Sequence, residues 1–106
     1  MVHIISVWLL AAGFLGAGIF NAIGTTGTKT DFARWGYPGW WHVLTGALEV
    51  LTALLIALPA SRIPGLALGA IIILAGIATV LRHRDFSHLP PLALFAAVIA
   101  VAALSS

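Results

Sequence analysis

The stretch from Trp41 to Leu81, WHVLTGALEVLTALLIALPASRIPGLALGAIIILAGIATVL, decides the fold. It holds two apolar runs, Trp41–Leu58 and Ile63–Leu81, each close to the roughly 20 residues that cross a bilayer as a helix. Pro59 ends the first run, and Pro64 suits the first turn of the second because the N–H that proline lacks is unpaired there. Since the connection is so short, the two helices are predicted to be antiparallel neighbours.

Apolar runs continue on both sides of this pair. Ile4–Gly24 precedes it, and Leu89–Leu104, the shortest and least certain span, follows it behind Pro90-Pro91. Of the 106 residues, 61% are hydrophobic and 8% are charged, which is too little charge to cover the surface of a soluble domain. The sequence therefore predicts an all-α, integral membrane, up-down four-helix bundle. It forms one transmembrane domain, residues 1–106, with helices at about 4–24, 41–58, 63–81 and 89–104.

The N-terminal run has a second interpretation, which is a cleaved signal peptide. Met1-Val2-His3 carries no Lys or Arg, and the run continues to Ile23, so a retained helix is expected instead. The absence of cysteine excludes disulfides and thiolate chemistry. A net charge of +2 gives no argument for a nucleic-acid partner.

Thr25 to Trp40 is the one long connection. Within it, Asp31 is predicted to cap a short interfacial helix, Phe32–Trp35, and Tyr37-Pro38-Gly39 is predicted to form a tight turn. The aromatic residues here are typical of a membrane interface, where an apolar ring with a polar N–H or O–H is favoured.

The basic residues indicate an orientation. The first and third connections carry four of them, and the other side, with both termini, carries Arg62. By the positive-inside rule, loops one and three are predicted to lie in the cytoplasm and both termini outside it. The four residues are Lys29, Arg34, Arg82 and Arg84.

Small residues form a seam on every predicted helix. On the third helix, Gly65, Gly69 and Gly76 follow spacings of four and seven, so they fall on one stripe. Small residues allow two helix backbones to approach closely in lipid. Tight packing within the chain explains them, and contacts in a homo-oligomer are the alternative.

A polar stripe runs along the second helix. His42, Thr45, Glu49 and Thr52 are spaced 3, 4 and 3 apart, so they share one face. Glu49 lies near mid-membrane, where a charge costs about 2.5–3.5 kcal/mol on insertion scales. Its carboxyl is therefore expected to be protonated, paired or facing a polar cavity.

Partners for Glu49 are expected from the same side of the membrane. Asn21 lies near the end of the first helix, and Thr79 lies near the end of the third. A polar funnel is predicted to open on this side, with Glu49 at its bottom and the Trp-rich loop over its mouth. Further candidates for its polar groups are Arg34, Arg82 and His83, and its walls would be Tyr37, Trp40 and Trp41.

Simpler explanations exist for each residue. Glu49 would be a protonated structural carboxyl, and His42 an interfacial residue at a helix start. The hydroxyls of Thr45, Thr52 and Thr79 would return to the carbonyl four residues back. No metal or haem site is predicted, because the histidines lack helical ligand spacing and none lies deep in a span. No covalent nucleophile is evident either.

The segment Phe32–Glu49, FARWGYPGWWHVLTGALE, resembles the signature of the DoxX-like membrane proteins, a "GYP" turn followed by a helix with "G-x-x-E". Ala78-Thr79-x-x-Arg82-His83 resembles the end of their third helix. Members often have a lysine near the end of the first helix, where this chain has Asn21, so a Lys–Glu pair is unavailable and a neutral, hydrogen-bonded carboxyl is favoured. The residues that match the motif are Gly36, Tyr37, Pro38, Gly46 and Glu49.

The resemblance implies a small inner-membrane protein. The family name derives from a subunit of a thiosulfate:quinone oxidoreductase, although most members have no known activity. The leading hypothesis is a bundle that binds a lipophilic molecule such as a quinone. A quinone is the candidate cofactor, and a membrane oxidoreductase is the candidate partner. The alternatives are a non-catalytic accessory subunit or chaperone, and an enzyme that uses Glu49 as a general acid. The ligand-binding residues would be Glu49, His42, Thr45, Asn21, Trp40, Trp41, Tyr37 and Thr79.

Overall fold

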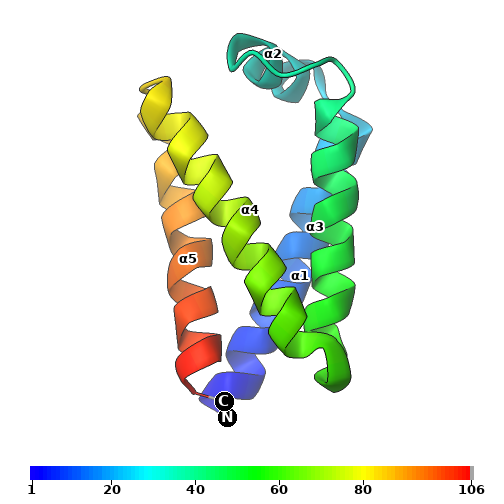
Figure 1. Ribbon diagram of the computed structural model, residues 1–106, viewed down its shortest axis with the longest axis vertical. Coiled ribbons are helices and arrows are strands. Elements are labelled where there is room, and N and C mark those ends of the chain that lie inside the picture. The colour runs from blue at the N-terminus through cyan, green and yellow to red at the C-terminus, as the bar shows by residue number, and fades with distance from the viewer. Residues whose placement is uncertain (106) are drawn as a thin grey trace.

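The computed structural model describes residues 1–105 and is helical throughout, with no strand in that part of the chain (Figure 1). The all-α class predicted from hydropathy is confirmed. There are five α-helices and two short 3₁₀ helices in this range. They are α1 (Val2–Ile23), α2 (Thr26–Arg34), α3 (Trp41–Ala57), η1 (Pro59–Ser61), α4 (Arg62–Arg82), η2 (Phe86–His88) and α5 (Leu89–Leu104).

Three helical segments are long and apolar enough to cross a membrane. They are α1, Pro59–Arg82 and Phe86–Leu104. The fourth run forms the shortest α-helix, as the sequence predicts: α5 has 16 residues and α3 has 17. Counted as continuous helical segments, however, the shortest of the four is α3. The reason is that η2 leads directly into α5 and lengthens that segment to 19 residues.

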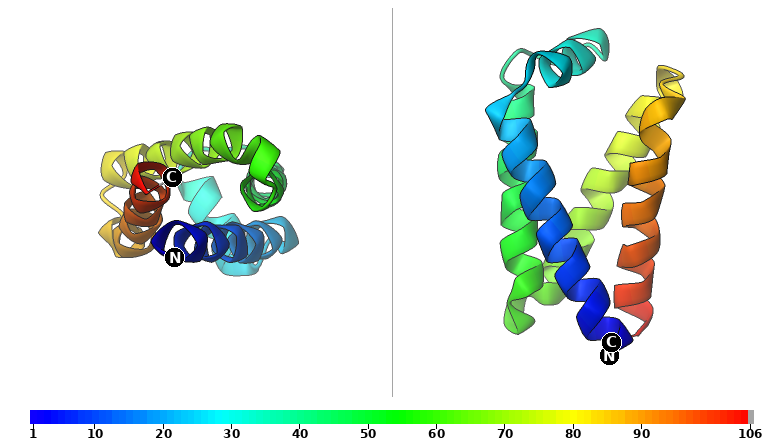
Figure 2. Two further views of the ribbon diagram at one scale, coloured as in Figure 1. Left: turned by 90° about the horizontal axis from the view of Figure 1, so that it is seen from below. Right: turned by 180° about the vertical axis from the view of Figure 1, so that it is seen from behind.

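The four long helices pack in a ring. α1 packs on α3, α3 on α4, α4 on α5, and α5 on α1, as the end-on view in Figure 2 shows. The core gathers at the end where α1 begins and α5 ends, around Phe14, Leu10 and Ile56. Toward the other end α4 diverges from α3, and α2 lies across this end (Figure 1).

The turn between α3 and α4 is built by side chains that bond the last carbonyls of α3. The Ser61 hydroxyl donates to the Leu55 oxygen at 2.9 Å, and Arg62 Nε donates to the Ile56 oxygen at 2.9 Å. Gly65 then lies so close to Leu55 and Ile56 that a Cβ there would be 2.8 Å from the Ile56 nitrogen. Arg62 is thus a cap for α3, which satisfies carbonyls that a helix end leaves unpaired.

The glycine seams serve packing within the chain. A Cβ at Gly18 would lie 2.7 Å from the Gly46 oxygen, and one at Gly69 would lie 3.0 Å from the Phe14 ring. Gly76 similarly faces Leu92 at 3.0 Å. These contacts support the packing explanation over the oligomer one for the glycines involved.

The short helix in the long connection differs from the prediction. It is α2, Thr26–Arg34, rather than Phe32–Trp35, and its cap is Thr25, whose hydroxyl accepts from the Thr28 N–H at 3.3 Å. Asp31 is not the cap but lies inside the helix. The prediction was wrong because Thr25 satisfies a free N–H of the first turn six residues earlier.

The end of α2 is set by Gly36, whose φ of 86° lies in the left-handed region. The Gly36 N–H donates to the Ala33 oxygen and the Tyr37 N–H to the Phe32 oxygen, both at 3.0 Å. This pair of bonds is a Schellman motif, in which glycine adopts the left-handed conformation without a Cβ penalty. The tight turn comes later than predicted and is closed by the Trp41 N–H donating to the Pro38 oxygen.

Candidate functional site: a cavity beside Glu49

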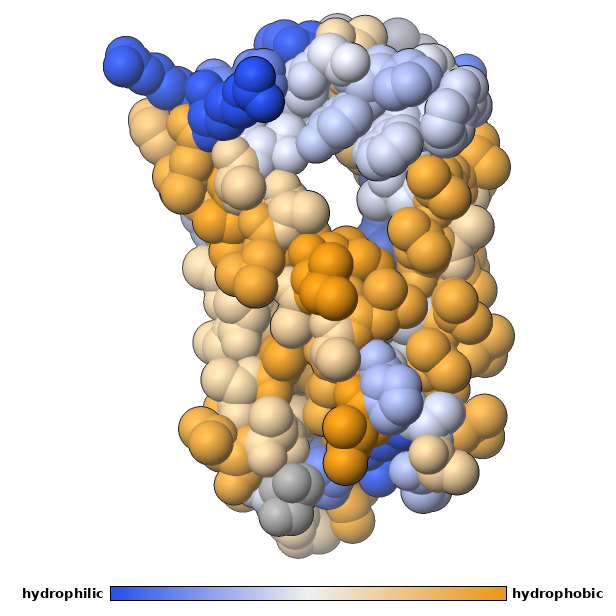
Figure 3. Space-filling view, viewed as in Figure 1, coloured by the Kyte–Doolittle hydropathy of each residue, from blue (hydrophilic) through white to orange (hydrophobic). Residues whose placement is uncertain are grey.

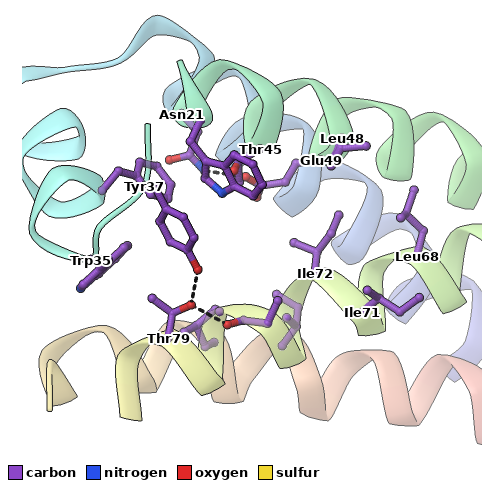
Figure 4. A pocket seen from close by; sticks show the side chains of 16 residues that line it. Asn21, Trp35, Tyr37, Thr45, Leu48, Glu49, Leu68, Ile71, Ile72 and Thr79 are labelled. Atoms are coloured by element: carbon purple, nitrogen blue, oxygen red, sulfur yellow. Dashed lines mark hydrogen bonds between the residues drawn. The ribbon is translucent and has the colours of Figure 1, made fainter. Parts of the chain in front are cut away.

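A cavity of about 330 Å³ lies where α3 and α4 diverge, beneath α2. Figure 3 shows this hollow opening on the face between α3 and α4. Most of its wall is apolar, with a few polar side chains from several helices (Figure 4). The wall residues are Asn21, Phe32, Trp35, Tyr37, Trp41, Thr45, Leu48, Glu49, Leu68, Ile71, Ile72, Ile73, Ala75, Gly76, Thr79 and Leu92.

Glu49 and Asn21 form the polar part of one wall. Asn21 Nδ2 donates to Glu49 Oε1 at 2.5 Å, and the Glu49 residue is only 6% exposed. The partner predicted from the sequence is thus in hydrogen-bond contact with the carboxyl. The second carboxyl oxygen makes no hydrogen bond within residues 1–105, so it is available to another group.

Close packing of α1 on α3 makes this bond possible. Gly46 lies one turn before Glu49, and a Cβ there would be 2.5 Å from the Gly18 oxygen and 2.6 Å from the Ala22 nitrogen. The absence of side chains at these two glycines brings the backbones together. As a result Asn21, a short side chain, reaches across the interface to Glu49.

Tyr37 and Thr79 form a second polar group on the opposite side of the cavity (Figure 4). Their hydroxyl oxygens are 2.7 Å apart, and the Thr79 hydroxyl donates to the Ala75 oxygen at 2.9 Å. Because the single Thr79 proton is used in that bond, Tyr37 is the donor to Thr79. Thr79 therefore returns its hydroxyl to the carbonyl four residues back, as does Thr52 to Leu48 at 2.8 Å.

Aromatic rings cover the end of the cavity below α2. Tyr37 stacks on Trp41 with ring centroids 5.2 Å apart and planes 6° apart. Phe32 meets Trp35 edge-on at 5.4 Å and Tyr37 at 6.0 Å. The rings thus pack on one another and form an apolar aromatic surface at this end of the cavity.

Two polar groups in the wall remain unpaired. The Thr45 hydroxyl and the Trp41 N–H make no hydrogen bond within the described residues. Among those residues no buried side-chain nitrogen or oxygen lacks a partner, so both groups are accessible rather than occluded. With the free oxygen of Glu49, they give the cavity donors and acceptors of its own.

Two of the eight expected site residues lie elsewhere. His42 is buried against α1's end, where a Cβ on Gly24 would be 2.4 Å from His42 Nε2. Trp40 is 59% exposed and does not line the cavity. Its ring contacts that of Trp41, with the ring centroids 5.5 Å apart. The other six line the cavity: Asn21, Tyr37, Trp41, Thr45, Glu49 and Thr79.

The further candidates Arg34, Arg82 and His83 also lie outside the wall. The structure adds Phe32 and Trp35, together with an apolar stripe on α4. Leu68, Ile72 and Ala75 of that stripe repeat at helical spacings of four and three, which is the one sequence signal that points to it. The funnel prediction is altered in one respect: the Trp-rich connection is a roof, and the opening lies at the side.

A protein-family model described as the DoxX-like family matches residues 5–103. The matched segment contains every residue of the cavity wall. Neither the curated proteins nor the solved structures include a match to this chain.

Proposed function

The chain belongs to the DoxX-like family, and we propose that it binds a lipophilic molecule with a polar ring, such as a quinone, in the cavity beside Glu49. It would act within a membrane redox system, next to an oxidoreductase. The observation that carries the proposal is the free carboxyl oxygen of Glu49 in a largely apolar hollow. Binding sites for small lipophilic molecules combine apolar walls with a few polar groups that fix orientation.

The position of the opening supports a ligand that is dissolved in the membrane. The hollow opens between two apolar helices, α3 and α4, and not only toward the end of the molecule (Figure 3). Apolar side chains line it from both helices, among them the half-buried Leu48 on α3 and the exposed Ile71 on α4. A ligand would therefore enter from the hydrocarbon without crossing a polar surface.

The polar groups on one wall suit a ring that carries an oxygen. The Thr45 hydroxyl and a neutral Glu49 carboxyl would donate to that oxygen, whereas the protons of the Tyr37–Thr79 pair on the opposite side are already used within the chain (Figure 4). The volume of about 330 Å³ lies at the low end of the range for small-molecule sites. The head group would fill it, and a long apolar tail would leave through the side opening.

The membrane topology is part of the proposal. The chain would cross the inner membrane four times as an up-down four-helix bundle, with α3 as the short span. Its 17 residues extend about 25 Å, somewhat less than the hydrocarbon core of about 30 Å. Loops one and three would lie in the cytoplasm.

An accessory subunit that acts through helix contacts is the alternative. It gains no support from the glycines that face α3, α5 or Phe14, because these already pack within the chain. Gly16 on α1 meets nothing within 4 Å and is the one glycine of the described spans left for such a contact.

The proposal is tested with a matched pair of threonine variants on α3. Thr45 lines the cavity, whereas Thr52, two turns further along the same face of α3, is fully buried and bonds its own helix. Thr45→Val and Glu49→Met should each weaken binding of a short-chain ubiquinone by about five- to tenfold, the usual effect of one lost hydrogen bond. Thr52→Val should leave it unchanged.

Binding is measured by equilibrium titration of the purified protein in nanodiscs, with mass spectrometry of copurified lipids as a second readout. If wild type binds no quinone, or if all three variants bind as wild type does, the cavity is not a quinone site.

A further inference from the structure

The roof of the cavity is attached firmly on one side only. Trp35 and Tyr37, which follow α2, line the cavity. Among the described helices, α2 packs its backbone on α3 and has no comparable packing on α4 or α5. On the α4–α5 side the roof is therefore held by side chains.

Apart from the Tyr37–Thr79 hydrogen bond, these side-chain contacts centre on Asp85. It lies just after α4 and accepts hydrogen bonds from Arg34 Nη2 and, at 3.1 Å, from Trp35 Nε1. Arg34 also pairs with Asp31 at 2.8 Å. His88, at the end of η2, lies 3.5 Å from the Asp31 carboxylate and meets the Trp35 ring edge-on at 5.5 Å.

The backbone before Asp85 is held in an uncommon conformation. Arg84 has a φ of 54°, in the left-handed region that non-glycine residues rarely adopt. The Asp85 N–H donates to the Val80 oxygen at 2.9 Å, which closes the turn. This turn places the carboxylate against α2 rather than along the axis of α4.

The same cluster brings three potential metal ligands together, since ligand atoms of Asp31, Asp85 and His88 lie within 4.8 Å of one another. Arg34, however, already pairs with both carboxylates. The arrangement is thus an ion-pair network that joins two parts of the fold.

The ends of α2 allow it to move. Gly24 and Gly36 flank the helix, and both have positive φ, at 69° and 86°. Glycine changes backbone conformation at such positions with little steric cost. The Arg34 side chain is 51% exposed, and ion pairs of such groups are weak enough to break and re-form.

We propose that α2 and the connection after it form a lid over the cavity, latched to the α4–α5 side by the contacts of Asp85 with Arg34 and Trp35. This rests on the proposed function in that the cavity is taken as the ligand site. Release of the latch widens the opening between α3 and α4, and its closure holds the ligand beside Glu49.

The chain has no cysteine, so a single introduced cysteine reports access to the cavity. Thr45→Cys places it in the wall, and its reaction rate with N-ethylmaleimide is measured in the full chain in nanodiscs without added ligand. Asp85→Ala should raise this rate about fivefold, the effect on an open–closed equilibrium of losing one partly exposed ion pair. Trp35→Phe, which keeps a ring but loses the N–H donor, should raise it by a smaller factor.

Two controls separate a lid from general loosening. Arg82→Ala removes an exposed cation close to the latch but outside it, and should leave the rate unchanged. A cysteine at the buried core position, Ala53→Cys, should stay unreactive when combined with Asp85→Ala.

Equal rates in the Asp85→Ala and Arg82→Ala backgrounds would overturn the latch. So would an equal rise at the Ala53→Cys position. Because the assay contains no ligand, a latch can be found in a chain that binds no quinone, and quinone binding can be found where no latch exists. Failure of one proposal is therefore distinguishable from failure of the other.

Discussion

Glu49 is a carboxyl group in the apolar interior, and Asn21 is its hydrogen-bond partner. An amide in place of a cation gives the carboxyl a donor without adding a second charge to the membrane interior. The free oxygen of the carboxyl faces the cavity side of α3, together with the unpaired hydroxyl of Thr45. At this scale the chemistry of the site depends on one hydrogen bond between two helices.

Removal of the donor should cost stability. Asn21→Leu leaves the Glu49 carboxyl unpaired and should lower the free energy of unfolding by about 1–3 kcal/mol. The double variant Asn21→Leu/Glu49→Met should recover most of the loss, because both partners are then apolar. Unfolding in mixed micelles with increasing sodium dodecyl sulfate, followed by circular dichroism, measures both. A double variant as unstable as the single one would show that this bond is not the cause.

At the scale of elements, the pattern Gly46-x-x-Glu49 acts as a unit on α3. Gly46 permits the closest contact of α3 with α1. One turn later on α3, Glu49 accepts a hydrogen bond from Asn21 of α1. The interface of α1 with α3 is accordingly the most extensive in the structure. Gly46 brings α3 close to α1, and this close approach allows the Glu49 carboxyl to reach Asn21.

Substitution of the glycines at the α1–α3 contact should show that close helix packing, and not glycine content as such, stabilises the protein. A Cβ at Gly18 or Gly46 would lie under 3.0 Å from backbone atoms, which cannot move aside as a flexible side chain does. Gly18→Ala and Gly46→Ala should each destabilise the protein by about 1–3 kcal/mol in the same unfolding assay. Gly16→Ala, on the same helix but facing open space, is the control and should have no such effect. Equal stability of the Gly16 and Gly18 variants would argue against a tight α1–α3 contact.

At the scale of the whole molecule, the ring of helices is packed at one end and open at the other. The open end also holds most of the basic residues. Four of the five Lys and Arg lie in or next to α2 and the end of α4, and the fifth, Arg62, bonds carbonyls of α3 at the opposite end. The cavity, the proposed lid and the basic loops thus occupy one half of the protein.

Reporter fusions test the proposed orientation. A C-terminal alkaline phosphatase should be active and a C-terminal green fluorescent protein dark, because the positive-inside rule puts this end outside the cytoplasm. Fusions truncated after Asp85 should give the reverse pattern and serve as the internal control. Fluorescence at the C-terminus with loss of phosphatase activity would invert the topology.

The sequence by itself determined that the chain is helical and where its four long apolar helices lie, but not the bounds of α2. Lipid requires long apolar helices, so hydropathy marks them directly, and Pro59, Pro64 and Pro90 mark their boundaries. It also named Asn21 among the candidate partners of Glu49, because both were expected to approach the same side of the membrane. The sequence also offered the simpler explanation for Thr52 and Thr79, that their hydroxyls bond the carbonyl four residues back. This contact is observed, and it needs only the local helix backbone.

Only the tertiary structure decided which residues line the cavity and which connection lies over it. Whether a residue near a helix start faces inward depends on the rotation of that helix, and this rotation turned His42 toward Gly24 and left Trp40 exposed. The divergence of α4 from α3 results from the packing of all four long helices. The residue pattern of a single helix therefore cannot predict it. Arg34 and Asp85 are 51 residues apart in the sequence. They meet because α4 diverges from α3, which leaves room for α2 to lie across this end of the molecule.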